Sequence, residues 1–204
     1  MLRFLIGLLL ALLLSPAMAQ DLAPIPPLKA RVTDLAGMLK PEQRAALEKT
    51  LQEHETKTGS QVAILLVNST APEVIEQYGI RVAEAWKLGR KGVDDGVILI
   101  IAKDNPRDLR RMRLEVGRGA EGVITDAMSK RILQDVIAPH FRQNDFYAGL
   151  NAGVTAIHAL LDKEAFPSVS KPAARAEQGG AGMWIWVLFI PLIFIVAIVR
   201  AVQT

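Results

Sequence analysis

The chain has 204 residues, with 24 Lys and Arg against 21 Asp and Glu, and it contains no cysteine. Disulfide bonds, thiol catalysis and cysteine-ligated zinc are therefore excluded. Between residues 31 and 163 the charges nearly cancel, with 19 basic and 18 acidic side chains, so the composition does not indicate a nucleic-acid-binding protein. A span of this length predicts one domain with an ordinary hydrophobic core.

The N-terminal residues 1–19 have the pattern of a secretory signal peptide. Arg3 precedes an apolar run, and the segment ends in the Ala-x-Ala pattern at Ala19 that signal peptidase accepts. The alternative is an uncleaved N-terminal anchor, and in both cases the following domain is exported. Residues 20–30 contain three prolines and predict an extended, stiff linker.

A second apolar segment lies near the C-terminus. Residues 183–199 are 17 uncharged, mostly apolar residues, which as a helix would cover about 25 Å and just span a bilayer. Residues 164–182, which contain proline, glycine and alanine, predict a flexible linker, and residues 200–204 a cytoplasmic stub. We therefore expect a single-pass protein of the cell membrane, with its domain on the periplasmic or extracellular side.

The first half of the domain predicts a βαβ unit. Residues 41–57 begin with a proline, repeat apolar residues at helical spacing and stop at Gly59, which indicates an amphipathic helix. Residues 61–68 and 96–102 are apolar runs typical of strands buried on both faces. Because residues 72–88 between them have a helical pattern, the two strands are expected to be parallel.

The second half begins with a hairpin. After a turn cluster at residues 104–108, residues 111–116 alternate between apolar and charged side chains, which predicts an antiparallel edge strand with one wetter face. Thr125 can cap a helix over residues 126–137, and Asn144 or Asp145 can cap another that ends near residue 161. The expected fold is α/β, a three-layer α/β/α sandwich with a small mixed sheet, followed by the C-terminal transmembrane helix.

Five carboxylates near strand or helix ends are candidates for a metal site. They are Asp34, Asp94, Asp95, Glu121 and Asp126. If these side chains converge at one edge of the sheet, they supply the oxygen ligands that Ca²⁺ or Mg²⁺ prefers. The alternative for each residue is structural: a turn former at Asp94 and Asp95, or a helix-terminal charge or cap at Asp34 and Asp126.

Three other patterns carry weaker signals. The glycines of residues 117–122 match a dinucleotide fingerprint, but they follow the last predicted strand, so we expect no dinucleotide and interpret them as shaping the loop that presents Glu121. The three histidines have no zinc-binding spacing. A basic group in residues 107–113 could meet anionic headgroups or an acidic partner, although a solvated hairpin is the commoner explanation.

Several short blocks, in order and spacing, resemble the TPM domain family across residues 31–163. They are Thr33-Asp34-Leu35-Ala36-Gly37, Gly59-Ser60-Gln61-Val62, Trp86-Lys87-Leu88-Gly89, Asp94-Asp95-Gly96-Val97, Gly117-Arg118-Gly119-Ala120-Glu121-Gly122, Thr125-Asp126 and Pro139-His140-Phe141. The Asp-Asp-Gly and Gly-x-Gly-x-Glu blocks are the most specific. A signal peptide, a TPM domain and a C-terminal membrane helix are also a common arrangement in bacterial members.

The resemblance implies two classes of function. Some members bind calcium, which supports a tethered calcium-binding module in the assembly or quality control of membrane protein complexes. A relative in the thylakoid lumen is described as an acid phosphatase, so a weak, metal-assisted phosphomonoesterase is the alternative. Asp94, Asp95 and Glu121 match the acidic blocks best. The sequence names no catalytic residue and leaves open whether the protein is an enzyme.

Overall fold

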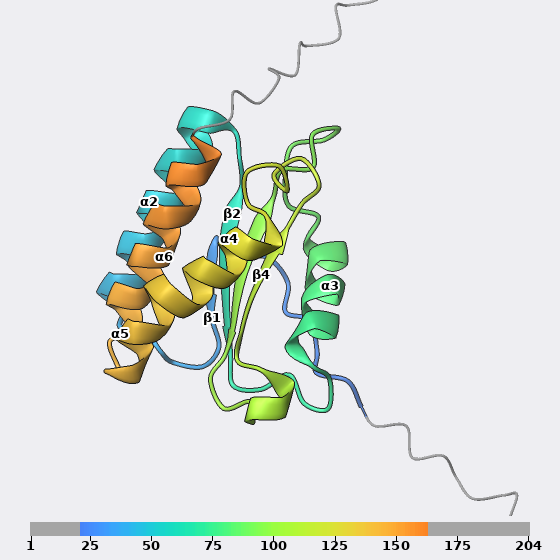
Figure 1. Cartoon of the computed structure of the whole chain (residues 1–204), viewed down its shortest axis with the longest axis vertical. Coiled ribbons are helices and arrows are strands. Elements are labelled where there is room, and N and C mark those ends of the chain that lie inside the picture. The colour runs from blue at the N-terminus through green and yellow to red at the C-terminus, as the bar shows by residue number, and fades with distance from the viewer. Residues whose placement is uncertain (1–20, 163–204) are drawn as a thin grey trace, which may run out of the picture. The chain divides into compact units, whose positions relative to one another are not determined.

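The computed structural model describes residues 21–162, which form an α/β fold around a small mixed sheet (Figure 1). Its strands are β1 (Val32–Asp34), β2 (Val62–Val67), β3 (Val97–Ala102) and β4 (Met112–Val116), side by side in that order. The first three are parallel, and β4 is antiparallel to β3. This confirms the mixed sheet and the antiparallel edge strand. The expected transmembrane helix at residues 183–199 lies outside the described residues.

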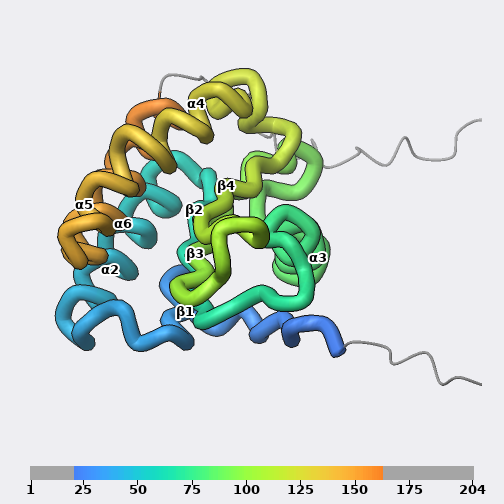
Figure 2. The backbone as a smooth tube through the Cα atoms, turned by 60° about the horizontal axis from the view of Figure 1, so that its bottom comes forward, coloured from blue at the N-terminus to red at the C-terminus, as the bar shows by residue number. Residues whose placement is uncertain are grey.

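Helices cover both faces of the sheet. Helix α3 (Ile75–Trp86) lies on one face and α2 (Pro41–Thr58) and α6 (Phe146–Leu161) lie on the other (Figures 1 and 2). On the side of α2 and α6, a continuous helical run consists of α4 (Asp126–Arg131), the π-helical segment η2 (Ile132–Ile137) and α5 (Ala138–Arg142). In residues 21–162 no helix combines the length and apolar character needed to cross a membrane.

The hydrophobic core lies on the two faces of the central strands. Every residue of β2 and β3 is buried, as expected of strands covered by helices on both sides. On the α3 side, Tyr78 and Val82 pack against alternate strand residues, including Leu65 and Ile100. The period-two arrangement therefore sends neighbouring strand residues into different halves of the core.

Most predicted boundaries hold within a few residues. Helix α2 ends at Thr58 and is capped by Gly59, whose φ of 83° is the left-handed conformation that glycine adopts without strain. Asp145 caps α6 by accepting a hydrogen bond from the Ala148 amide. Helix α3 begins at Ile75, later than expected, because residues 70–73 form a turn in which the Thr70 hydroxyl donates to the Glu73 carbonyl. Strand β1 was not predicted.

The proline-rich segment before β1 is docked on the domain. Trp86 Nε1 donates to the Pro26 carbonyl at 2.7 Å, and the Tyr78 hydroxyl donates to the Pro24 carbonyl at 3.1 Å. Ala23 and Ile25 pack against the core on the α3 side. The segment therefore covers part of α3. Its carbonyls accept the hydrogen bonds of the Tyr78 hydroxyl and the Trp86 indole nitrogen, whose rings are otherwise buried.

Two stacked histidines join α2 to α6. The rings of His54 and His158 lie 3.7 Å apart at an angle of 5°, and His54 Nε2 lies 3.2 Å from a carboxylate oxygen of Asp162. Burial, reinforced by the neighbouring His54, lowers the pKa of His158 to about 4. The folded protein therefore holds His158 neutral at pH values where an unfolded chain protonates it.

The stacked pair predicts a stability that falls with acidity. Between pH 6.5, near the pKa of an unfolded histidine, and the folded pKa of about 4, the unfolded state binds more protons, so the free energy of unfolding decreases as pH falls. Because solvent screens the partly exposed ring, the decrease should be about 2 kcal/mol, less than the full value of the shift. Thermal unfolding followed by circular dichroism should show this slope. His158→Gln should flatten it, and His140→Gln, outside the stack, should not. The same slope in His158→Gln would show that other groups cause it.

Candidate functional site

Asp95 stands just before β3 and is fully buried. One carboxylate oxygen accepts a hydrogen bond from the Arg90 amide at 2.8 Å, and the other accepts from the Ser60 hydroxyl at 2.8 Å and from Arg90 Nε at 2.9 Å. A buried carboxylate is stable in its charged form when it has this kind of ionic and hydrogen-bonding partner. Asp95 therefore fastens the loop of residues 90–95 to the end of α2.

The loop after β4 packs directly on the backbone before β3. The Gly119 amide donates to the Asp94 carbonyl at 3.0 Å. A Cβ atom at Gly117 would collide with the same carbonyl, and one at Gly119 would collide with the Val93 carbonyl. These two glycines permit close approach of two loops, which agrees with their predicted role of shaping the loop that leads to Glu121.

The five predicted metal ligands occupy different parts of the fold. Asp94 and Glu121 are exposed and lie at one end of the sheet, because one precedes β3 and the other follows the antiparallel β4. The Asp94 carboxylate lies 3.9 Å from Arg118 Nε. Asp34 is the last residue of β1, at the opposite end of the sheet, where its oxygens accept hydrogen bonds from three backbone amides. Asp126 opens α4.

These positions do not fit a site built from all five carboxylates. Asp95 and Asp34 use their oxygens within the fold. Across residues 21–162, no three histidine, aspartate or glutamate side chains are grouped so that they could hold a metal ion. Asp94 and Glu121 are the two candidates whose carboxylates remain exposed at a common end of the sheet. Calcium binding stays a prediction that would rest on these two residues.

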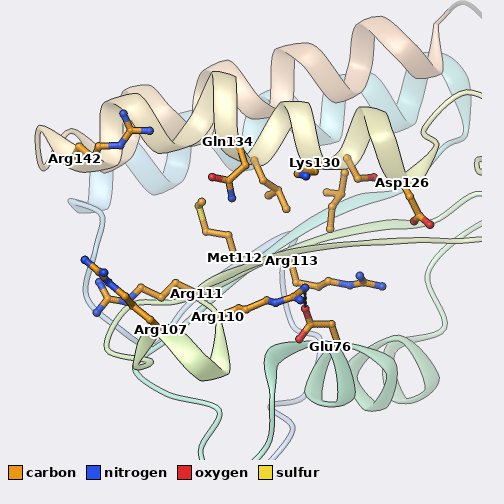
Figure 3. A pocket seen from close by; sticks show the side chains of 13 residues that line it. Glu76, Arg107, Arg110, Arg111, Met112, Arg113, Asp126, Lys130, Gln134 and Arg142 are labelled. Atoms are coloured by element: carbon orange, nitrogen blue, oxygen red, sulfur yellow. Dashed lines mark hydrogen bonds and ion pairs between the residues drawn. The ribbon is translucent and has the colours of Figure 1, made fainter.

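A second feature is a cleft of about 970 Å³ that runs along β4 (Figure 3). Its walls are the start of α3 on one side and the α4–η2–α5 run on the other, and the turn before β4 closes one end. Six cationic side chains and two carboxylates line the cleft. The cations are Arg107, Arg110, Arg111, Arg113, Lys130 and Arg142, and the carboxylates are Glu76 and Asp126. We call this feature the cationic cleft.

Some of these cations are already paired. Arg110 lies 2.6 Å from Glu76, and Arg113 binds Glu115 through two nitrogens. The hydrogen bond to Glu115 is the main cause that raises the pKa of Arg113. In contrast, Arg107, Lys130 and Arg142 make no ion pair with any residue between 21 and 162. The cleft therefore holds positive charge that the fold does not neutralise.

An apolar crevice of about 420 Å³ adjoins the cationic cleft at the carboxyl end of β3. Its apolar lining includes Met38, Ile101, Phe141 and Phe146, and it shares Arg111, Met112 and Arg142 with the cleft. Open α/β sheets commonly bind ligands in the crevice at the carboxyl ends of their parallel strands. The basic group at residues 107–113 is contiguous and could be recognised in the sequence. Lys130, Arg142 and the crevice were not predicted, because their residues come from separate helices with no shared motif.

Comparisons with solved structures found several similar proteins. The chain is similar to the solution structure of the N-terminal domain of a protein from P. gingivalis, with 30% identity and a TM-score of 0.58, over 65% of this chain and 82% of that one. It is also similar to BA42 from Bizionia argentinensis, with 17% identity and a TM-score of 0.49, over 64% and 86% of the two chains. No curated protein matches.

A third similar structure is the N-terminal domain of cg2496 from Corynebacterium glutamicum, with 13% identity and a TM-score of 0.49, over 74% of this chain and 92% of that one. The family assignment comes from the sequence match. A model of the TPM domain, named TPM_phosphatase, matches residues 32–160, which is more than half of the chain. This chain therefore belongs to the TPM domain family.

Proposed function

We propose that this TPM domain is an interaction module, held outside the cell membrane by a C-terminal helix, that binds an acidic protein partner. The observation that carries the proposal is the cationic cleft, in which Arg107, Lys130 and Arg142 have no carboxylate partner in the described domain. A concave surface with one sign of charge raises the local concentration of oppositely charged partners and speeds their association. The assembly or quality control of membrane protein complexes is a setting that such a module would suit.

The composition of the cleft favours a carboxylate-bearing partner. Guanidinium groups present planar pairs of donors that match carboxylate geometry, and four of the six cations here are arginines of the turn and strand β4. Figure 3 shows the Arg107 and Arg111 side chains gathered at one end of the cleft, with Arg142 on the facing helix α5. An elongated acidic surface could therefore contact cations from both walls.

A weak phosphatase is the second candidate. Arginines can also bind a phosphate ester, and the same cleft contains one carboxylate, Asp126, that forms no ion pair within residues 21–162. In this candidate, Arg113 and Lys130 would neutralise the phosphate and Asp126 would assist hydrolysis. The family model carries the word phosphatase in its name, which is a reason to test the activity.

The cleft predicts charge-dependent peptide binding. The full-length chain in phosphatidylcholine nanodiscs should bind a fluorescent, glutamate-rich peptide, and its glutamine analogue should bind more weakly. Arg107→Gln combined with Arg142→Gln should weaken binding about tenfold, since two exposed pairs are each worth about 0.5–1 kcal/mol. Fluorescence anisotropy measures both effects. Arg44→Gln, an exposed change on α2, is the matched control.

The same preparation separates the two candidates. We expect no hydrolysis of p-nitrophenyl phosphate above the rate of the Asp126→Asn variant. If the protein hydrolyses the ester, Asp126→Asn abolishes the hydrolysis and the peptide does not bind, the interaction module would be rejected in favour of the phosphatase.

Calcium at the loop of Asp94 and Glu121 is a further part of the proposal. A hundredfold excess of Ca²⁺ over its dissociation constant stabilises a binding-competent fold by about 2.7 kcal/mol, or roughly 5–10 °C in melting temperature. Asp94→Asn should remove this rise and leave the calcium-free melting temperature unchanged. Asp95→Asn should lower the melting temperature with or without calcium, because it removes the charge that Arg90 binds. No rise in the unmodified protein would exclude the calcium site.

The proposed location predicts a protection pattern. Protease added to spheroplasts should digest the domain between residues 21 and 182 and leave a small fragment that contains residues 183–204, because the apolar segment would be inside the bilayer. Immunoblotting with a C-terminal tag detects the fragment. A domain that stays intact until the membrane is permeabilised would place it on the cytoplasmic side.

A further inference from the structure

Strand β4 is an edge strand whose outer side is unpaired. It is last in the sheet order and pairs with β3 alone. In an antiparallel ladder, every second residue bonds to the neighbouring strand. The Ala102 amide donates to the Arg111 carbonyl and the Gly117 amide donates to the Gly96 carbonyl. The residues that bond to β3 are therefore the odd-numbered ones between 111 and 117. The backbone groups of Met112, Leu114 and Val116 therefore face outward.

This open edge lies within the cationic cleft. Met112, Arg113 and Leu114 all line it, with α3 on one side and the α4–η2–α5 run on the other. Among residues 21–162, no segment bonds the outward backbone groups of β4. An edge strand in a groove between helices is a template for an additional strand.

We propose that an extended, acidic polypeptide segment of a partner protein binds by adding a strand to the outer edge of β4. This inference rests on the proposed function and specifies how the acidic partner is held. Backbone hydrogen bonds to Met112 and Leu114 would supply affinity that does not depend on sequence, and the walls of the cleft would select the side chains.

The two faces of β4 predict the pattern of the partner segment. Arg113 lies on the α3 side, where Glu115 approaches Gly79. Leu114 is buried on the opposite side, beside Leu99 in the ladder. Neighbouring strands place side chains of like position on the same face. The segment should therefore alternate, with apolar residues beside Met112 and Leu114 and acidic residues on the α3 side, where a partner carboxylate would share Arg113 with Glu115.

The apolar crevice extends this pattern at the start of β4. Met112 lines both the cleft and the crevice, so an apolar side chain of a segment on β4 can reach Phe141 and Phe146. Methionines such as Met38 adapt to different apolar shapes. Arg111 and Arg142 flank the opening and would meet a neighbouring carboxylate.

Charge favours an external partner over the chain's own linker. Residues 163–182 contain Lys163, Lys171 and Arg175 against Glu164 and Glu177. This segment has no acidic excess with which to complement the cationic cleft. An anionic lipid could meet the cations, but it has no backbone amides and carbonyls to pair with the edge of β4.

The first test uses backbone methylation of a peptide. The full-length chain in phosphatidylcholine nanodiscs is titrated with a labelled peptide of about six residues that alternates glutamate and valine. Methylating the amides of one set of alternate residues should weaken binding at least tenfold, because these amides face β4. Methylating the other set should have a smaller effect. Equal affinities for the two methylated peptides would overturn strand addition.

The second test changes the protein. Met112→Pro removes an outward amide, whereas Met112→Ala removes the same side chain and keeps that amide. The proline variant should bind the peptide about tenfold more weakly than the alanine variant, with circular dichroism confirming that both are folded. Equal binding by the two folded variants would overturn the inference. If the proline variant does not fold, the methylated peptides decide.

These outcomes separate the inference from the proposed function. Binding that depends on glutamate but not on backbone methylation would keep the acidic partner and reject strand addition. No binding of the alternating or the glutamate-rich peptide would reject both. Binding of phosphatidylglycerol vesicles without binding of either peptide would identify the cleft as a lipid surface and also reject both.

Discussion

The buried pair of Asp95 and Arg90 determines how the two loops at one end of the sheet are arranged. The Asp95 carboxylate accepts hydrogen bonds from both Arg90 and Ser60. Because Asp95 lies two residues before β3 and Ser60 lies two residues after α2, these bonds fix the start of β3 relative to the end of α2. The glycines after β4 then pack on the backbone beside Asp95. Because β4 takes its register from β3, the orientation of its outer edge depends on this pair. Removing one partner of a buried pair typically costs about 3–5 kcal/mol.

The fold could be predicted where a long segment repeats one pattern. Helix α2 and strands β2 and β3 are examples, because their periodicity reflects burial on one face or on both. Strand β1 has three residues, too few for an alternating pattern. The docking of Pro24 and Pro26 on α3 depends on Tyr78 and Trp86, which lie more than fifty residues away, and no local pattern indicates such contacts.

The candidate sites were less predictable than the fold. An acidic pair before a buried strand suggests a ligand set, yet Ser60 and Arg90 turn one of its members inward, and neither contact follows from spacing. The cationic cleft combines side chains from the turn before β4, from β4 itself and from two later helices. The group near residue 110 is visible in the sequence because it is contiguous. Lys130 and Arg142 join it only after the helical run crosses beside β4.

The docked N-terminal arm would limit where the domain can stand if residues 1–19 are a signal peptide, as the sequence predicts. Arg81 donates to the Ala23 carbonyl, so the chain is already held against α3 at the third residue after residue 20. If residues 1–19 were still in the bilayer, residues 20–22 would reach only about 10 Å. Helix α3 would then stand close to the membrane surface. Cleavage would release that end, and the distance of the domain from the bilayer would then depend on the proposed C-terminal linker and anchor.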